Sequence, residues 1–276
     1  MNAVYYQGEK GSFSELAARK YFGPGVKSIG LFQFDDVFRT VRSRKRAFGL
    51  IPVENTLTGS IHQNYDRLLK YDLWIWGEIK LRIRFNLFAR PGAELPDLRE
   101  VWSHPVALEQ CQQFFNRHAR LKVKPVYDTA GAAKILCAIR RNNVGIIAGP
   151  QVAKIYNLRT VEKKIEDNPQ NYTRFLVLGK EKNVAPGPNA KTSLAFGVKN
   201  APGVLFRCLS VFALRNIDLV KLESRPIIGK PWEYLFYIDF RGSLAEAKSR
   251  NAVESLTEAA AYTKVLGCYA EKPEAR

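Results

Sequence analysis

A turn between residues 53 and 60, VENTLTGS, contains more hydrogen-bonding side chains than a turn needs. It combines a carboxylate, an amide, three hydroxyls and a glycine, at Glu54, Asn55, Thr56, Thr58, Gly59 and Ser60. Side chains of these types can donate and accept hydrogen bonds at several points around one small ligand. The segment therefore predicts a binding loop.

The segment NYTRF, residues 171 to 175, places a hydroxyl, a guanidinium and a ring at the start of an apolar run. A strand that begins here sends Thr173 and Arg174 to opposite faces, because side chains alternate along a strand. We expect Thr173 to present its hydroxyl to a cleft. For Arg174, a structural ion pair and the binding of a carboxylate both remain open.

Three further loops place polar side chains just before an expected helix. The loops are GEKGSFSE at 8–15, SHP at 103–105 and DTAG at 128–131, and their candidate contacts are Ser12, Ser103, His104 and Thr129. Such side chains cap helices, and the N–H groups of a helix start can also bind an anion. Helix capping and ligand binding therefore both remain open for each loop.

Short apolar segments alternate with amphipathic ones through the first 180 residues. This alternation indicates an α/β fold with parallel-rich sheets, in which ligands bind beyond the carboxyl ends of the strands. The periodicity predicts strands at 3–8, 48–53, 76–90, 100–104, 143–149 and 173–179, and helices at 14–22, 60–71, 105–118 and 129–142.

The chain changes character after residue 180, where EKNVAPGPNAK reads as a linker. The remaining residues predict the order βαββαβ, which is typical of a ferredoxin-like module. Its strands are expected at 192–198, 217–226, 232–240 and 263–269, and its helices at 202–216 and 243–261. Modules of this kind commonly pair with a second copy.

The composition is that of a globular protein, with 276 residues, 46% of them apolar, and a net charge of +17. The length favours about two domains. Most of the charge excess lies in residues 1–190, which carry 30 basic and 17 acidic side chains. A solvated surface explains the basic run at 42–46 better than nucleic-acid binding does, because no aromatic residues interleave with it. A positive field would also attract a small polyanion.

The four cysteines are far apart, and no histidine lies at a metal-ligand spacing from them. We therefore expect free thiols, no metal site and no disulfide framework. No segment of about 20 apolar residues is present, and the first residues lack the pattern of a signal peptide. The expected location is the cytoplasm, without membrane contact.

The motifs GEKGSFSE, VENTLTGSIHQNYDRLL, SHPVALEQC, DTAGAAK and DNPQNYTRF occur in this order and precede ESRP and PWEYLFYIDF. Together they resemble the prephenate dehydratase family with its C-terminal ACT regulatory domain. The resemblance implies a catalytic domain over residues 1–180, a linker over 181–190 and an ACT domain over 191–276. It also implies two catalytic lobes, as in periplasmic binding proteins, formed by 1–80 with 169–180 and by 81–168. The monofunctional form is expected, since no chorismate mutase segment precedes the first strand.

The family's reaction converts prephenate to phenylpyruvate with loss of CO2 and water, in L-phenylalanine biosynthesis and without a cofactor. The resemblance implies that Thr173 donates a hydrogen bond or proton to the departing hydroxyl, while Glu54 and Asn55 orient the ring. The further substrate contacts that it implies are Ser12, Thr56, Gly59, Ser60, Ser103, His104, Thr129, Arg174 and Phe175.

The ACT resemblance implies that L-phenylalanine binds between two paired modules of a homodimer or homotetramer. The implied contacts are Asn200, Gly203, Val204, Leu205, Glu223, Ser224, Arg225 and Pro226. A dimerisation module without a ligand is the alternative.

Three positions depart from the family's usual pattern, namely Val106, where glutamine is usual, and Gly149 and Pro150, where a serine is common. Two alternatives to prephenate dehydratase therefore stay open. One is arogenate dehydratase, whose substrate carries an amine in place of the side-chain keto group. The other is a catalytically impaired protein that binds an amino acid.

Overall fold

The computed structural model describes residues 3–183, 189–227, 229 and 233–271. The chain divides into two compact units, each of which draws on separate stretches of sequence. Of the described residues, the first unit contains those up to Arg67 together with Ile79–Phe175, and the second contains Leu68–Glu78 and those from Leu176 to Glu271. The boundaries at residues 80, 168 and 180 expected from the sequence stay predictions.

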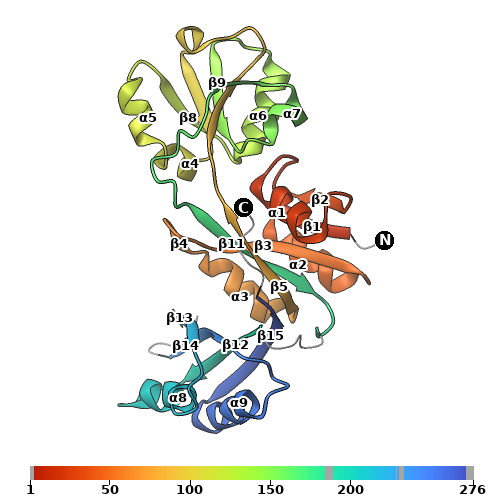
Figure 1. The fold of residues 1–276 in the computed structure, drawn as a ribbon, viewed down its shortest axis with the longest axis vertical. Coiled ribbons are helices and arrows are strands. Elements are labelled where there is room, and N and C mark those ends of the chain that lie inside the picture. The colour runs from red at the N-terminus through yellow and green to blue at the C-terminus, as the bar shows by residue number, and fades with distance from the viewer. Residues whose placement is uncertain (1–2, 184–188, 228, 230–232, 272–276) are drawn as a thin grey trace. The chain divides into compact units, whose positions relative to one another are not determined.

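The first sheet has the strand order β2-β1-β3-β11-β5, with the short β4 beside β3 (Figure 1). Strand β1 runs parallel to both of its neighbours, and its three central residues are buried. The first helix after it starts where Ser12 accepts a hydrogen bond from the N–H of Glu15. The elements of this part are β1 (Ala3–Gln7), α1 (Phe13–Phe22), β2 (Lys27–Leu31), α2 (Phe34–Ser43), β3 (Ala47–Asn55), β4 (Gly59–Ser60), α3 (His62–Tyr71), β5 (Trp74–Arg82) and β11 (Tyr172–Gly179).

The second sheet has the order β10-β6-β9-β7-β8 and mixes parallel and antiparallel pairs. A core of alanine, valine, isoleucine and leucine side chains packs α6 and α7 against it. Its elements are β6 (Asn86–Ala89), η1 (Leu95–Asp97), β7 (Glu100–Ser103), α4 (Pro105–Glu109), α5 (Gln112–Arg117), β8 (Lys122–Pro125), α6 (Thr129–Ile139), β9 (Val144–Ala148), α7 (Val152–Tyr156) and β10 (Arg159–Glu162).

The third sheet is antiparallel, with the order β13-β14-β12-β15, and helices α8 and α9 pack on it through a phenylalanine-rich core. The chain order is βαββαβ, as the sequence predicts. The elements are β12 (Ala190–Val198), α8 (Val204–Ala213), β13 (Leu219–Pro226), β14 (Tyr234–Arg241), α9 (Ala247–Ala259) and β15 (Tyr262–Ala270).

Two long elements expected from the sequence are each divided in the structure. The strand expected at 76–90 forms β5 and β6, which belong to different sheets. The helix expected at 105–118 forms α4 and α5, because the side chain of Asp167 accepts hydrogen bonds from the N–H groups of Gln112 and Gln113 and caps the second helix. Within the described residues, no helix is long and apolar enough to cross a membrane.

Candidate active site

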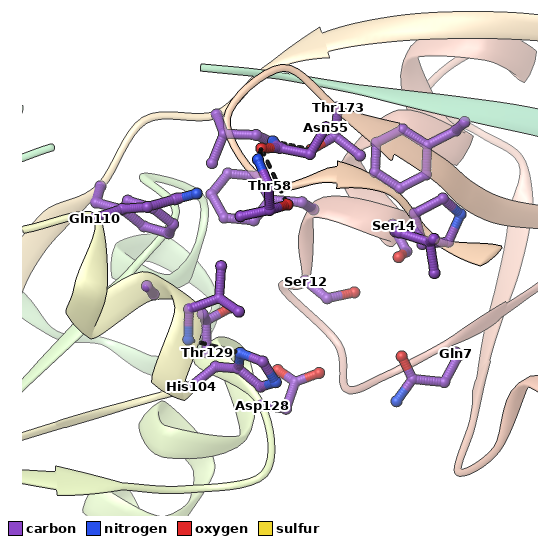
Figure 2. Close-up of a pocket in the computed structure, with 18 of the residues that line it drawn as sticks. Gln7, Ser12, Ser14, Asn55, Thr58, His104, Gln110, Asp128, Thr129 and Thr173 are labelled. Carbon is purple, nitrogen blue, oxygen red and sulfur yellow. Dashed lines mark hydrogen bonds between the residues drawn. The ribbon is translucent and has the colours of Figure 1, made fainter. Parts of the chain in front are cut away.

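A cavity of about 450 Å³ lies in the first unit, a volume in the range of small-molecule binding sites. Its lining comes from loops and strand ends of the first two sheets (Figure 2). The side chains around it are mainly aromatic rings, hydroxyls and amides. They belong to Gln7, Ser12, Phe13, Ser14, Phe34, Pro52, Asn55, Thr58, Ile61, Ile83, Phe85, His104, Val106, Ala107, Gln110, Tyr127, Asp128, Thr129, Thr173 and Phe175.

The hydroxyl of Thr173 is held at the cavity by the amide of Asn55. Asn55 Nδ2 donates to Thr173 Oγ1 at 3.0 Å, and only 9% of Thr173 is exposed. The orientation of this amide is fixed, because Asn55 Oδ1 accepts from the backbone N–H groups of Leu57 and Thr58. Backbone N–H groups can only donate, so the NH2 end must face Thr173. Thr173 Oγ1 therefore accepts from Asn55 and retains its own proton for another partner.

The same amide continues into a chain of hydrogen bonds that the sequence analysis did not identify. Asn55 Nδ2 also donates to Asn171 Oδ1 at 2.7 Å, and Asn171 Nδ2 donates to Gln110 Oε1 at 2.8 Å. Each amide in the series is oriented by the one before it, which leaves the NH2 group of Gln110 as a donor beside the cavity. The motifs SHPVALEQC and DNPQNYTRF contain these two residues, but their spacing gave no signal that they meet.

Helices α1 and α6 both begin at the cavity. Ser12 caps α1, and Thr129 is the first residue of α6 after the cap Asp128. Helix starts carry a partial positive charge, so both favour an anionic group. The predicted residues Ser12 and Thr129 line the cavity, together with the ring of Phe175.

Three titratable groups of the lining have shifted pKa values, namely His104, Asp128 and Tyr127, and burial raises the pKa of Tyr127 to about 12. Burial lowers the pKa of His104, although the nearby carboxylate of Asp128 opposes this effect. His104 Nδ1 accepts a hydrogen bond from the N–H of Val106, so the neutral ring carries its proton on Nε2. Burial raises the pKa of Asp128, while the backbone N–H groups of Gly131, Ala130 and Glu9 oppose the shift.

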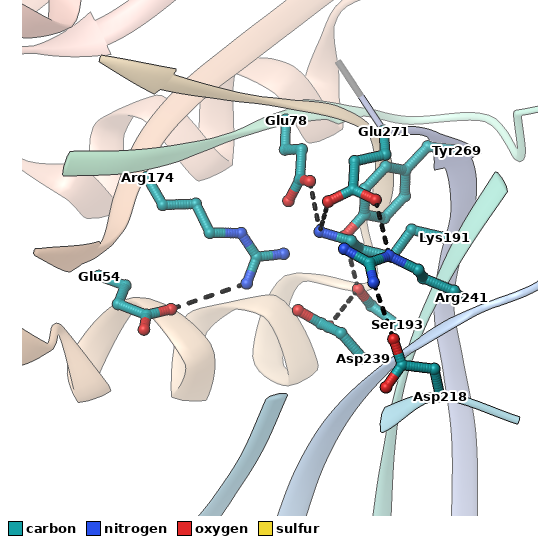
Figure 3. Close-up of polar contacts among 10 residues, drawn as sticks. All are labelled: Glu54, Glu78, Arg174, Lys191, Ser193, Asp218, Asp239, Arg241, Tyr269 and Glu271. Carbon is teal, nitrogen blue, oxygen red and sulfur yellow. Dashed lines mark hydrogen bonds and ion pairs between the residues drawn. The ribbon is translucent and has the colours of Figure 1, made fainter. Parts of the chain in front are cut away.

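Six residues that the sequence analysis assigned to the site lie outside the cavity lining. Glu54 and Arg174 form an ion pair at 3.8 Å (Figure 3). Side chains alternate along β3 and β11, so Glu54 and Arg174 face away from the cavity that their neighbours Asn55 and Thr173 line. The other four are Thr56, whose hydroxyl donates to the Gln170 carbonyl, Ser103, whose hydroxyl donates to the Ile147 carbonyl, and Gly59 and Ser60 of β4.

The predicted effector residues lie in two places within the C-terminal module. Gly203 has a φ of 73° and precedes Val204 and Leu205 at the start of α8, with Asn200 in the loop before it. Glu223, Ser224, Arg225 and Pro226 end β13, an edge strand whose residues alternate between half-buried and exposed. The effector site in this module stays a prediction.

No group of three or more histidine, cysteine, aspartate or glutamate side chains in the described ranges could hold a metal ion. The cavity residues carry hydroxyl, amide, imidazole and carboxyl groups, which can form hydrogen bonds and transfer protons.

Two α/β sheets with a shared cavity of hydroxyls, amides and rings form a domain that suits the binding of a small polar ligand. Residues 4–183 match the family model of prephenate dehydratase. A relative from Arabidopsis thaliana, arogenate dehydratase/prephenate dehydratase 2, is 43% identical and aligns with 96% of this chain and 72% of its own length. The chain therefore belongs to the prephenate dehydratase family and is a hydro-lyase.

Solved structures agree with this fold. The prephenate dehydratase of Arthrobacter aurescens in complex with L-Phe has a TM-score of 0.89 and 26% identity, over 99% of this chain and 92% of that one. GqqA, described as a novel type of quorum quenching acylase, has a TM-score of 0.91 and 27% identity over 99% of both chains.

Proposed function

We propose that this chain catalyses the decarboxylating dehydration of prephenate or L-arogenate, with Thr173 as the hydrogen-bond donor to the departing hydroxyl. The C1–carboxylate bond breaks and its electron pair enters the ring. The C4–oxygen bond then breaks, and the ring becomes aromatic. CO2 and water leave, and the product is phenylpyruvate from prephenate or L-phenylalanine from L-arogenate.

The position of Asn55 carries this proposal. Hydroxide is a poor leaving group unless a donor stabilises it as the C–O bond breaks. Because Asn55 Nδ2 donates to Thr173 Oγ1, the Thr173 proton is directed away from Asn55 and is available to the substrate. A threonine hydroxyl is a weak acid, so its contribution is a positioned hydrogen bond, and the proton that completes the water molecule is relayed from solvent.

The rest of the cavity suits the substrate's two carboxylates and its ring. Ser12 and Thr129 lie at helix starts, and Gln110 offers an amide NH2 group. The net charge of +17 adds an attractive field for an anion. Phe175 and the neighbouring rings of the lining supply an apolar surface for the six-membered ring.

The test is a pair of substitutions at Thr173. Thr173→Val keeps the shape and removes the hydroxyl, and Thr173→Ser keeps the hydroxyl. We expect kcat on both substrates to fall by about 10² or more for the valine variant, the scale of one positioned donor, and to stay within about tenfold for the serine variant. Equal rates for Thr173→Val and the native chain would exclude this role.

We propose further that the C-terminal module binds L-phenylalanine as an effector in a paired assembly of two chains. The glycine-led start of α8 offers N–H groups to the amino acid's carboxylate. The relative solved with L-Phe supports this choice of ligand. Calorimetric titration with L-phenylalanine tests it, with Gly203→Ala expected to weaken binding because a φ of 73° disfavours a side chain.

A further inference from the structure

The proposed function leaves two substrates, and they differ at one group. Prephenate carries a keto oxygen on its side chain, and L-arogenate carries an ammonium there. Prephenate is therefore a dianion, whereas L-arogenate has two carboxylates and one positive charge. A cavity that distinguishes them must treat a buried positive charge differently from a neutral carbonyl.

The formal charges of the cavity lining are few. Among the described residues that line it, lysine and arginine are absent and Asp128 supplies the one carboxylate. Burial keeps His104 biased towards its neutral form, since its pKa is lowered. The lining thus presents one negative side chain and many neutral donors to its ligand. This favours a ligand that carries a cationic group of its own.

The Asp128 carboxylate is held in a fixed position. Its Oδ1 accepts from the N–H groups of Ala130 at 2.6 Å and Gly131 at 3.0 Å, which cap α6, and the backbone N–H of Glu9 also donates to the carboxylate. A methyl group on Gly8 would lie 2.8 Å from Oδ2, which means that the backbone approaches the second oxygen closely because residue 8 has no side chain. A carboxylate fixed in this way loses little conformational freedom when it binds an ammonium.

The environment of Asp128 also leaves its negative charge poorly solvated. Burial is the main cause that raises its pKa, ahead of the opposing backbone hydrogen bonds. A cation beside it would offset that desolvation. The keto oxygen of prephenate would instead place a second acceptor against the carboxylate.

On these observations we propose that Asp128 binds the ammonium of L-arogenate and makes L-arogenate the preferred substrate over prephenate. The inference rests on the proposed function, and it adds a specificity-determining residue to it. Its competitor is a purely structural role, in which Asp128 only caps α6.

Asparagine separates the two roles, because it caps helices as well as aspartate does but carries no charge. In Asp128→Asn, we expect kcat/KM for L-arogenate to fall at least about tenfold, mainly through KM, the loss expected for one charge-assisted hydrogen bond. We expect kcat/KM for prephenate to be unchanged or higher. The ratio of the two specificity constants is the decisive quantity, since a general loss of active protein cancels from it.

Glu9→Gln is the matched control. Glu9 is a neighbouring carboxylate outside the cavity lining, where it accepts from Tyr127 Oη at 3.0 Å and from Lys134 Nζ at 2.9 Å. Its substitution removes the same charge, and the substrate ratio should change by less than about twofold. Asp128→Ser, which also caps without charge, replaces the asparagine variant if that protein does not fold.

Each outcome has one meaning. If Asp128→Asn leaves the substrate ratio unchanged, or if the native chain prefers prephenate, the assignment to Asp128 is wrong while the dehydratase proposal stands. If the native chain consumes neither compound, the proposed function itself fails. A lowered ratio in Asp128→Asn with an unchanged ratio in Glu9→Gln supports the assignment.

Discussion

Asn55 Nδ2 lies 3.0 Å from Thr173 Oγ1, and the backbone N–H groups of Leu57 and Thr58 dictate which end of the Asn55 amide meets that hydroxyl. The direction of the hydrogen bond is therefore set by local chain geometry in the turn after β3. The direction in which the Thr173 hydroxyl donates its proton therefore depends on whether the side chain at position 55 is a donor or an acceptor.

The substitution Asn55→Asp tests this dependence. A carboxylate has no hydrogen to donate, so the Thr173 hydroxyl would donate to it instead. The Thr173 proton would then no longer be available for a hydrogen bond to the substrate. We expect kcat to fall by about 10² or more, measured by product formation. Asn64→Asp is the control, because the buried Asn64 Nδ2 donates to the Pro52 carbonyl at 2.8 Å and does not contact Thr173. A similar fall in kcat for both variants would point to a general structural effect.

A buried ion pair in the second unit gives a stability prediction. Lys191 Nζ lies 2.5 Å from Glu78 Oε1 and 3.3 Å from Glu271 Oε1, and Lys191 is 3% and Glu78 0% exposed (Figure 3). Lys191→Met removes the cation that both of these carboxylates contact, so we expect a loss of about 3–5 kcal/mol in the free energy of unfolding, measured with urea. Adding Glu78→Leu should recover much of that loss, and no recovery would contradict an ionic origin.

The lowered pKa of His104 predicts a pH dependence of stability. Its pKa lies below the usual 6.5 because burial disfavours the charged ring. Above about pH 6.5 both the folded and the unfolded chain hold it neutral, and as the pH falls further the unfolded chain takes up the proton first. The contribution to stability is therefore lost on acidification. In His104→Asn, which can still cap α4, the free energy of unfolding should fall less steeply between about pH 6.5 and 5.

Two glycines with positive φ angles allow the effect of backbone strain to be distinguished from the effect of contact with the site. Gly8 has a φ of 118° and Gly23 a φ of 99°, but an added methyl group meets Asp128 Oδ2 at 2.8 Å in the first and nothing within 4 Å in the second. Gly8→Ala and Gly23→Ala should each cost about 1–3 kcal/mol of stability from strain. Only Gly8→Ala should also raise KM, which steady-state kinetics would measure. An unchanged KM would show that the Asp128 carboxylate can move aside.

Much of the architecture follows from periodicity, because buried strands and amphipathic helices leave clear patterns. The segments VGIIA and YTRFLVLG form β9 and β11, and the order of strands and helices in the C-terminal module agrees with the prediction. Strand β8 was not predicted, because all four of its residues are exposed and the segment lacks the alternation of apolar and polar side chains that marks a half-buried strand. Strands β2 and β10 are short and half-exposed, and they left equally little signal.

Motifs bring some cavity residues to attention, whereas long-range pairing decides the geometry around them. The motifs point to Thr173 and Asn55, which both line the cavity, and their roles stay predictions. Gln110 joins them through Asn171, a contact across 61 residues of sequence that no local pattern encodes. The resemblance implies that Glu54 orients the substrate, which stays a prediction, and in the structure Glu54 forms an ion pair with Arg174. The effector residues still await a test.

Strand β11 lies between β3 and β5 in the first sheet, although it follows them by about a hundred residues in the chain. During synthesis, β3 and β5 therefore emerge from the ribosome long before the strand that joins them. Their facing edges have unsatisfied N–H and C=O groups until residues 172–179 arrive. The same late strand carries Thr173. The nascent chain thus completes its sheet and acquires its proposed donor in one step, and a product truncated before residue 172 would lack both.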